Sequence, residues 1–231
     1  MVKNQTINLA VVESVALALE ELKNEVVFVG GAVVSIYVTD EGADQPRPTK
    51  DIDITVQVSS YSQMENLREK LASKGIFPSP ESTVMYRYKY DDIQIDFIPW
   101  DATPLGPTNS WLKPGFDHAE SVTVGKTEIK VLTVPYFLAS KWEAYRSRGS
   151  DPRTSHDFED IIYVLDNNLN VVDSIQSADE GVKRELCKMA NGILSMASME
   201  ECIECHINPY TAEERKNIVV DKVKMIATVQ S

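Results

Sequence analysis

The chain has 231 residues, enough for one large domain or two small ones. Hydrophobic residues make up 43% of it, which is ample for a packed core. Its 35 aspartates and glutamates outnumber 23 lysines and arginines, so the net charge is −12. Such a chain repels nucleic acid at long range, which argues against a long duplex as a partner. There is no signal-peptide pattern and no apolar stretch approaching ~20 residues, so we expect a cytoplasmic protein without a membrane partner.

The first elements that the sequence predicts are a helix, a strand and a glycine turn. Apolar residues at helical spacing over 6–24 predict an amphipathic helix, and the apolar run 26–29 predicts a strand. Gly30 and Gly31 then open a second helix that extends to about residue 38. Glycines let backbone N–H groups approach a phosphate at such a helix N-terminus. A tight strand-to-helix turn is the alternative interpretation of the glycine pair.

A polar loop over residues 40–50 leads to two aspartates that alternate with isoleucines. Alternation over residues 51–54 predicts a strand with Asp51 and Asp53 on one face of a sheet. Neighbouring carboxylates repel each other, and Mg²⁺, which prefers hard carboxylate oxygens, removes that repulsion. An exposed strand edge with two solvated acids is the alternative, but the upstream glycine pair favours the metal site.

The next segment predicts a helix and a hairpin that brings a third acid to the sheet. A helix over 61–74 ends at Gly75, and residues 83–90 and 93–98 alternate as the two arms of a β-hairpin. On the second arm Asp96 lies between apolar neighbours, where a carboxylate needs a partner. That partner is either a basic side chain or a metal shared with the two earlier aspartates. Three acids on neighbouring strands suit two-metal phosphoryl or nucleotidyl transfer.

The rest of the chain changes from strands to helices. A connection rich in proline and glycine over 99–117 precedes a second hairpin around Gly125, and from Pro135 onwards the pattern is helical, with later helices at about 179–199 and 211–229. The sequence therefore predicts an α+β fold with two domains, residues 1–132 and 133–231.

The predicted helix that begins at Pro135 carries a basic face. Lys141, Tyr145 and Arg148 share one side of it, and Arg146 and Arg153 complete a local basic cluster. Such a cluster suits a nucleoside triphosphate or one end of an RNA, whereas complementing the helix dipole is the alternative. The following helix opens near Asp157, which by itself reads as part of an N-terminal cap with Thr154.

The three cysteines do not require a metal or haem. Cys202, Cys205 and His206 form the spacing of a haem-attachment motif, and Cys187 would complete a zinc set. Haem attachment needs an exported chain, and Cys187 lies fifteen positions before the pair, so reduced thiols are the expectation.

Two blocks of residues resemble a known family. Gly30-Gly31, the pattern Arg47-x-Thr49-x-Asp51-x-Asp53 and Asp96 on a later strand resemble the nucleotidyltransferase fold of the polymerase-β type. Within it the pattern is most similar to the AbiEii-type group, which includes toxins of bacterial toxin–antitoxin systems. The second block, which spans residues 135–160, is similar to the family's lysine-bearing helix followed by an aspartate-bearing one: Pro135, Leu138, Lys141, Ala144, Arg146, Asp157 and Asp160.

The resemblance implies a nucleotidyltransferase-fold mixed sheet flanked by helices, followed by a C-terminal helical domain. It implies an enzyme that moves a nucleoside monophosphate from a nucleoside triphosphate onto a hydroxyl of an RNA 3′ end, a protein or a small molecule, with an antitoxin as a possible partner. Asp51, Asp53 and Asp96 would hold Mg²⁺, Asp96 serving alternatively as general base. The glycine pair would hold phosphates, Lys141 would supply positive charge to the pyrophosphate, and Asp157 would support Lys141 or the acceptor. A metal-dependent nuclease and a non-catalytic nucleotide-binding module are the rival interpretations.

Overall fold

The computed structural model describes residues 9–101 and 109–229. The chain forms two compact units. The sheet unit comprises Met1–Val33 and Arg47–Thr133, and the helical unit comprises Val34–Pro46 and Val134–Ser231. Segment 34–46 therefore belongs with the helices although it lies between two strands in the sequence. The division into domains 1–132 and 133–231 stays a prediction.

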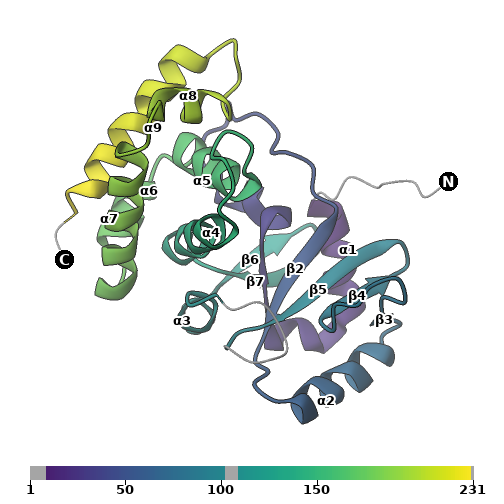
Figure 1. Cartoon of the computed structure of the whole chain (residues 1–231). Helices are drawn as coiled ribbons and strands as arrows, with labels where there is room; N and C mark the ends of the chain where they lie inside the picture. The colour runs from purple at the N-terminus through teal and green to yellow at the C-terminus, as the bar shows by residue number, and fades with distance from the viewer. Residues whose placement is uncertain (1–8, 102–108, 230–231) are drawn as a thin grey trace. The chain divides into compact units, whose positions relative to one another are not determined.

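The sheet unit contains one mixed sheet (Figure 1). Among the described residues its strands follow the order β3-β4-β5-β2-β1-β7-β6. β2 pairs in parallel with β5, and β1 in parallel with β7, while the remaining neighbours are antiparallel. The strands are β1 (Val26–Val29), β2 (Asp51–Val56), β3 (Phe77–Pro78), β4 (Arg87–Tyr90), β5 (Ile93–Pro99), β6 (Glu120–Val124) and β7 (Thr127–Val131). The predicted mixed α+β architecture is confirmed.

Strand alternation divides β2 and β5 between the core and the site. Ile52 and Ile54 are fully buried, as are Ile95 and Phe97 on β5. Asp51 and Asp53 are half-buried on the other face, as a period of two residues requires. The apolar face is covered in part by helices whose inward side chains are fully buried, including Val12, Val15, Leu19 and Leu71.

The helices of the sheet unit are short. They are α1 (Leu9–Leu19), the 3₁₀ helix η1 (Glu20–Glu25), α2 (Tyr61–Ala72) and α3 (Leu112–Asp117). The Ser60 side chain caps α2 by accepting a hydrogen bond from the Gln63 amide. Gly75 follows α2 with a φ of +76°, the left-handed conformation that commonly ends a helix.

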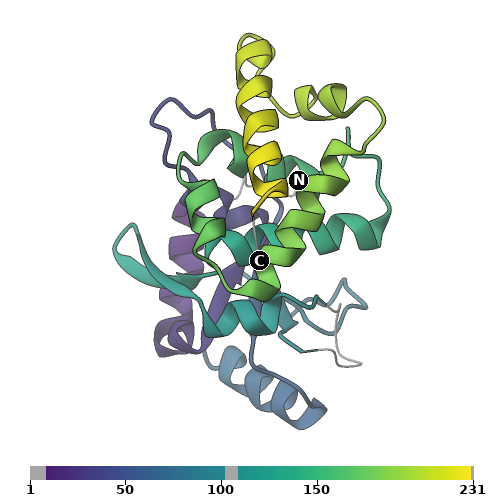
Figure 2. The same ribbon diagram turned by 90° about the vertical axis from the view of Figure 1, so that its left-hand side faces the viewer.

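Six helices build the helical unit within the described residues (Figure 1, Figure 2). They are α4 (Val134–Arg148), α5 (His156–Asn167), α6 (Val171–Gln176), α7 (Glu180–Leu194), α8 (Met199–Glu204) and α9 (Ala212–Ala227). α7 and α9 pack against each other through alternating apolar turns, with Leu186, Ile193, Val219 and Val223 fully buried. None of the described helices is long and apolar enough to cross a membrane.

Segment 34–46 is held to the helical unit by hydrogen bonds at the end of α5. The amides of Thr39 and Asp40 donate to the Asn167 carbonyl, each at 3.0 Å. Arg215 on α9 joins Asp40 and Asp166 through its guanidinium, at 2.8 and 2.7 Å.

Lys222 on α9 satisfies the carbonyls at the end of α5. The last carbonyls of a helix have no partner within the helix, and here Lys222 donates to three carbonyls in this region: those of residues 165, 166 and 168. Burial lowers the pKa of Lys222 and raises that of Asp166.

Several local expectations were wrong or incomplete. The helix after the glycine pair is the 3₁₀ helix η2 (Gly31–Tyr37), since a run rich in β-branched residues follows the glycines. The short elements β3, α3, α6 and α8 were not predicted, because segments of two to six residues carry too little periodicity. Residues 6–8 of the first predicted helix and 102–108 of the proline- and glycine-rich connection lie outside the described residues.

Candidate active site

The sheet brings three carboxylates together. Asp53 on β2 lies directly opposite Asp96 on the parallel strand β5, and Asp51 lies two residues before Asp53 on the same face. One carboxylate oxygen from each aspartate can be chosen so that all three lie within 4.8 Å of one another. Asp96 is buried, with 5% of its surface exposed, whereas the other two are half-buried. This is the one group of potential metal ligands found among the described residues.

Asp96 also has a basic partner that the sequence analysis did not name. Arg87 lies opposite Asp96 in the antiparallel pair of β4 and β5. Its Nε and Nη2 atoms donate to the two carboxylate oxygens at 2.8 and 2.7 Å. These hydrogen bonds raise the pKa of the Arg87 guanidinium. A two-residue turn at Asp91-Asp92 pairs residue 87 with residue 96 by simple counting, so the hairpin pattern contained the signal for this contact.

The glycine turn lies against the second aspartate. Gly30 has a φ of +74°, and a Cβ placed on it would overlap Oδ2 of Asp53. β1 also pairs with β2 so that Val29 is opposite Asp53. The strand-to-helix turn is therefore adjacent to the carboxylates, and only a residue without a side chain allows this approach.

Thr49 has a structural contact near the start of β2. It is buried, and its hydroxyl donates to the backbone carbonyl of Asp51 at 3.4 Å. This contact indicates a structural role for Thr49, in which the side chain orients the strand that carries the acids.

The helical unit contains a second cluster, formed by one lysine and two aspartates. Lys141 on α4 is buried, and its Nζ lies 2.7 Å from Asp160 and 3.4 Å from Asp157 on α5. Arg148, whose side chain is 65% exposed, pairs with the other oxygen of Asp157. Desolvated charges require such partners, so removing one of them leaves the others uncompensated. The alternative interpretation of Asp157, as part of a helix cap with Thr154, is wrong, since Ser155 caps α5 by accepting from the Phe158 amide.

The cysteine-containing segment forms no metal cluster within the described residues. Cys187, Cys202 and Cys205 are free thiols, of which Cys202 is buried, and burial raises its pKa. The Nε2 atom of His206 lies 2.7 Å from the Pro152 carbonyl, so hydrogen bonding occupies this ring nitrogen.

The donor set at the sheet fits a hard divalent cation. Three carboxylates supply only oxygen, the ligand that Mg²⁺ prefers, and it completes its shell with water and phosphate. Each oxygen of Asp96 has two lone pairs, of which the hydrogen bonds of Arg87 use one. The site therefore provides oxygen ligands while Arg87 stays in place.

The mixed sheet with its acidic face and adjoining helices has the architecture of nucleotidyltransferases. A family model described as "Nucleotidyl transferase AbiEii toxin, Type IV TA system" matches residues 15–188. The chain belongs to this AbiEii family of nucleotidyltransferases. No curated protein matches the sequence significantly.

One solved structure supports the fold, and a second is similar at a lower score. A nucleotidyltransferase-like antigenic protein from Paracoccidioides brasiliensis is similar with a TM-score of 0.52 and 15% identity, over 87% of this chain and 93% of that one. The antibiotic-resistance factor ANT(2'')-Ia has a TM-score of 0.46 and 12% identity, over 81% of this chain and 93% of the other.

Replacing Gly30 by alanine tests the close approach to Asp53. We expect Gly30→Ala to destabilise the protein more than Gly75→Ala, because both sites have the same left-handed backbone but only Gly30 has a side chain in the way. The backbone strain alone costs roughly 1–2 kcal/mol at each position. Urea unfolding of both variants measures the difference, and equal losses would contradict the overlap.

Replacing Arg87 tests whether the carboxylates need a cation. In EDTA, Arg87→Met should lower the free energy of unfolding by about 2–4 kcal/mol, since the buried Asp96 loses its partner and the guanidinium is only partly exposed. Mg²⁺ should then raise the melting temperature of the variant more than that of the unaltered protein, because it compensates the same charge.

Lys89→Met is the matched control for Arg87→Met. Lys89 lies two residues along the same strand and pairs with the exposed Glu81. It should change stability by no more than about 0.5 kcal/mol and leave the Mg²⁺ response unaltered. Identical Mg²⁺ responses in all three proteins would argue against a cation at the three carboxylates.

Proposed function

We propose that the protein is a Mg²⁺-dependent nucleotidyltransferase that moves a nucleoside monophosphate from a nucleoside triphosphate onto a hydroxyl acceptor. The convergence of Asp51, Asp53 and Asp96 within 4.8 Å carries the proposal, because clustered carboxylates serve a metal-assisted displacement at phosphorus. Membership of the AbiEii family supports the same class of reaction. A two-metal arrangement, cytoplasmic location and a toxin role with an antitoxin partner belong to the proposal.

The reaction joins the acceptor hydroxyl oxygen to the α-phosphorus while the bond to the β-phosphate oxygen breaks and pyrophosphate leaves. Mg²⁺ bound to the carboxylates would neutralise phosphate oxygens and align the two reacting groups. Asp51 and Asp53 project toward this position from one strand. Asp96 either supplies a further metal ligand or accepts the hydroxyl proton, and its oxygens keep lone pairs for either role beside Arg87.

The remaining residues have positioning roles in this proposal. Gly30 and Gly31 let the triphosphate approach the backbone next to Asp53, which the left-handed turn at Gly30 supports. Lys141 supplies positive charge to the departing pyrophosphate. Asp157, together with Asp160, holds the Lys141 ammonium in place. The acceptor is an RNA end, a protein or a small molecule.

A metal-dependent nuclease and a non-catalytic nucleotide-binding module remain the rivals. A nuclease would use three acids but needs no nucleoside triphosphate. Incubation of the pure protein with each labelled nucleoside triphosphate, Mg²⁺ and a cell lysate separates the three, because only the transferase releases pyrophosphate and leaves label on an acceptor. Absence of label with every nucleotide would overturn the proposal.

A thermal-shift experiment tests the ligand site without an acceptor. Mg²⁺ with a nucleoside triphosphate should raise the melting temperature by mass action, and the double variant Asp51→Asn with Asp53→Asn should lose this response. Its apo form should be as stable or more so, because like-charge repulsion is relieved. Asp91→Asn with Asp92→Asn, at the exposed turn of the hairpin, is the control and should respond normally. An unstable apo double variant would instead assign the acids a structural role.

Burial changes how Lys141 must be tested. Lys141→Met alone should lower the free energy of unfolding by about 3–5 kcal/mol, because buried Asp160 and Asp157 lose a cation. Adding Asp160→Leu removes both members of the closer pair and should recover much of that loss, since Asp157 keeps Arg148.

The stabilised double variant then reports on catalysis. Loss of an electrostatic contact to a phosphate lowers turnover on the order of 10²- to 10³-fold. Asp160→Asn, which retains Lys141 and its contact with Asp157, is the control and should lower turnover far less than the loss of the lysine. Full transferase activity in Lys141→Met with Asp160→Leu would remove Lys141 from the mechanism.

A further inference from the structure

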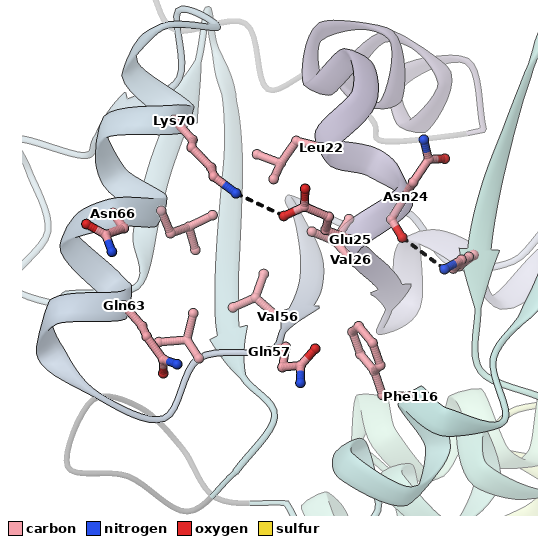
Figure 3. A pocket seen from close by; sticks show the side chains of 13 residues that line it. Leu22, Asn24, Glu25, Val26, Val56, Gln57, Gln63, Asn66, Lys70 and Phe116 are labelled. Atoms are coloured by element: carbon pink, nitrogen blue, oxygen red, sulfur yellow. Dashed lines mark hydrogen bonds and ion pairs between the residues drawn. The ribbon is translucent and has the colours of Figure 1, made fainter.

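The sheet unit contains a cavity at the opposite end of the strands that carry the acids. β1 and β2 place Val29 opposite Asp53 at one end and Val26 opposite Val56 at the other. A cavity of about 630 Å³ lies beside Val26 and Val56 (Figure 3). At ~3.3 Å per residue, Asp53 and Val56 are about 10 Å apart along β2. The cavity is therefore distinct from the carboxylate site.

The floor of the cavity is apolar and includes an aromatic ring at one side. Its aliphatic side chains are each no more than 7% exposed: Leu22, Val26, Val56, Val58 and Leu67. Phe116 of α3 lies beside Gln57 in Figure 3. Trp100 packs against the Phe116 ring in a T-shaped contact with centroids 5.1 Å apart, which fixes the ring position. A flat apolar group fits such a surface.

The rim is rich in amide side chains. Four of them line the cavity: Asn24, Gln57, Gln63 and Asn66. Gln63 accepts hydrogen bonds from Ser59, whereas the side chains of the other three have no protein partner within the described residues. Each amide offers both a donor and an acceptor, the combination that recognises the edge of a nucleobase.

One cation at the cavity has no acidic partner. Lys130 donates to the backbone carbonyl of Asn24 at 2.9 Å, and no carboxylate pairs with it among the residues the structure describes. The other lysine, Lys70, pairs with Glu25 at 3.0 Å. A positive charge that is not compensated locally, in a chain of net charge −12, favours an anionic ligand.

We propose that this cavity binds a nucleotide, separately from the carboxylate site. The base lies on the apolar floor beside Phe116, the rim amides contact its edge, and Lys130 contacts the phosphate. Aromatic rings stack on any base, and a lysine pairs with phosphate as a point charge. The volume lies within the range of about 300–1,000 Å³ that is usual for small-molecule sites. The ligand is a nucleoside monophosphate, either free or as a unit of an RNA strand.

Binding is tested on the full chain with the carboxylate site disabled. In EDTA, the variant with Asp51→Asn and Asp53→Asn should bind at least one of the four nucleoside monophosphates at millimolar concentration by calorimetry. Adding Lys130→Gln should weaken binding about tenfold, the usual effect of one charge-assisted contact. Adding Lys126→Gln, in the turn between β6 and β7 and outside the cavity, should leave it unaltered. Since the tested protein lacks two of the three acids and no divalent cation is present, failure of the proposed catalytic function would not affect this result.

Two further ligands identify the chemical class that binds, and a second variant tests the cavity independently of Lys130. Inorganic phosphate should bind at least about tenfold more weakly than the mononucleotide, because it lacks the base. Asn66→Asp on α2, which adds a negative charge at the rim, should weaken binding independently of Lys130. A short oligoribonucleotide that binds much more tightly than the monomer identifies an RNA strand as the source, and equal affinity identifies the free nucleotide. No mononucleotide binding, phosphate binding of equal strength, or no effect of both Lys130→Gln and Asn66→Asp would overturn the proposal.

Discussion

In the sheet unit, β2 and β5 pair in parallel and place Asp53 directly opposite Asp96. Like charges opposite each other in a sheet destabilise it, so this pairing requires a positive charge nearby. Arg87 on β4 supplies one by donating hydrogen bonds to both carboxylate oxygens of Asp96. Asp51 and Asp53 lie on the adjacent strand β2. The arrangement of the site follows from this requirement, since the side of the sheet that accommodates the acids must also admit compensating cations.

The helical unit meets the same requirement by a different route. There, Lys141 is buried between two aspartates of the next helix, and an exposed arginine shares one of them. A lysine enclosed in this way loses rotational freedom before any ligand binds, which favours pre-organised electrostatic contacts over adjustable ones.

Much of the candidate site could be predicted from local patterns. Alternation over 51–54 and 93–98 indicated which acids share a face, because a period of two residues is decided by the strand itself. The basic partner of Asp96 follows from the register of the hairpin by counting, whereas the burial of Lys141 depends on contacts with a helix that begins at His156. Non-local packing of this kind leaves little trace in a single sequence. The amide-rimmed cavity could not be predicted for the same reason, since its lining comes from five separate stretches of the chain that share no periodic pattern.

Segment 34–46 gives the two units an unusual connection. The chain leaves the sheet unit after Val33, returns at Arg47 and leaves again after Thr133, so three covalent links join the units. The first link follows the turn that carries Gly30, and the second precedes the strand that carries Asp51 and Asp53. Between these two links, segment 34–46 is held to α9 by the ion pair of Asp40 with Arg215. If a protease cut the chain within residues 134–150, segment 34–46 would still hold the two fragments together. It is covalently part of the N-terminal fragment, and it is hydrogen-bonded to helices of the C-terminal fragment.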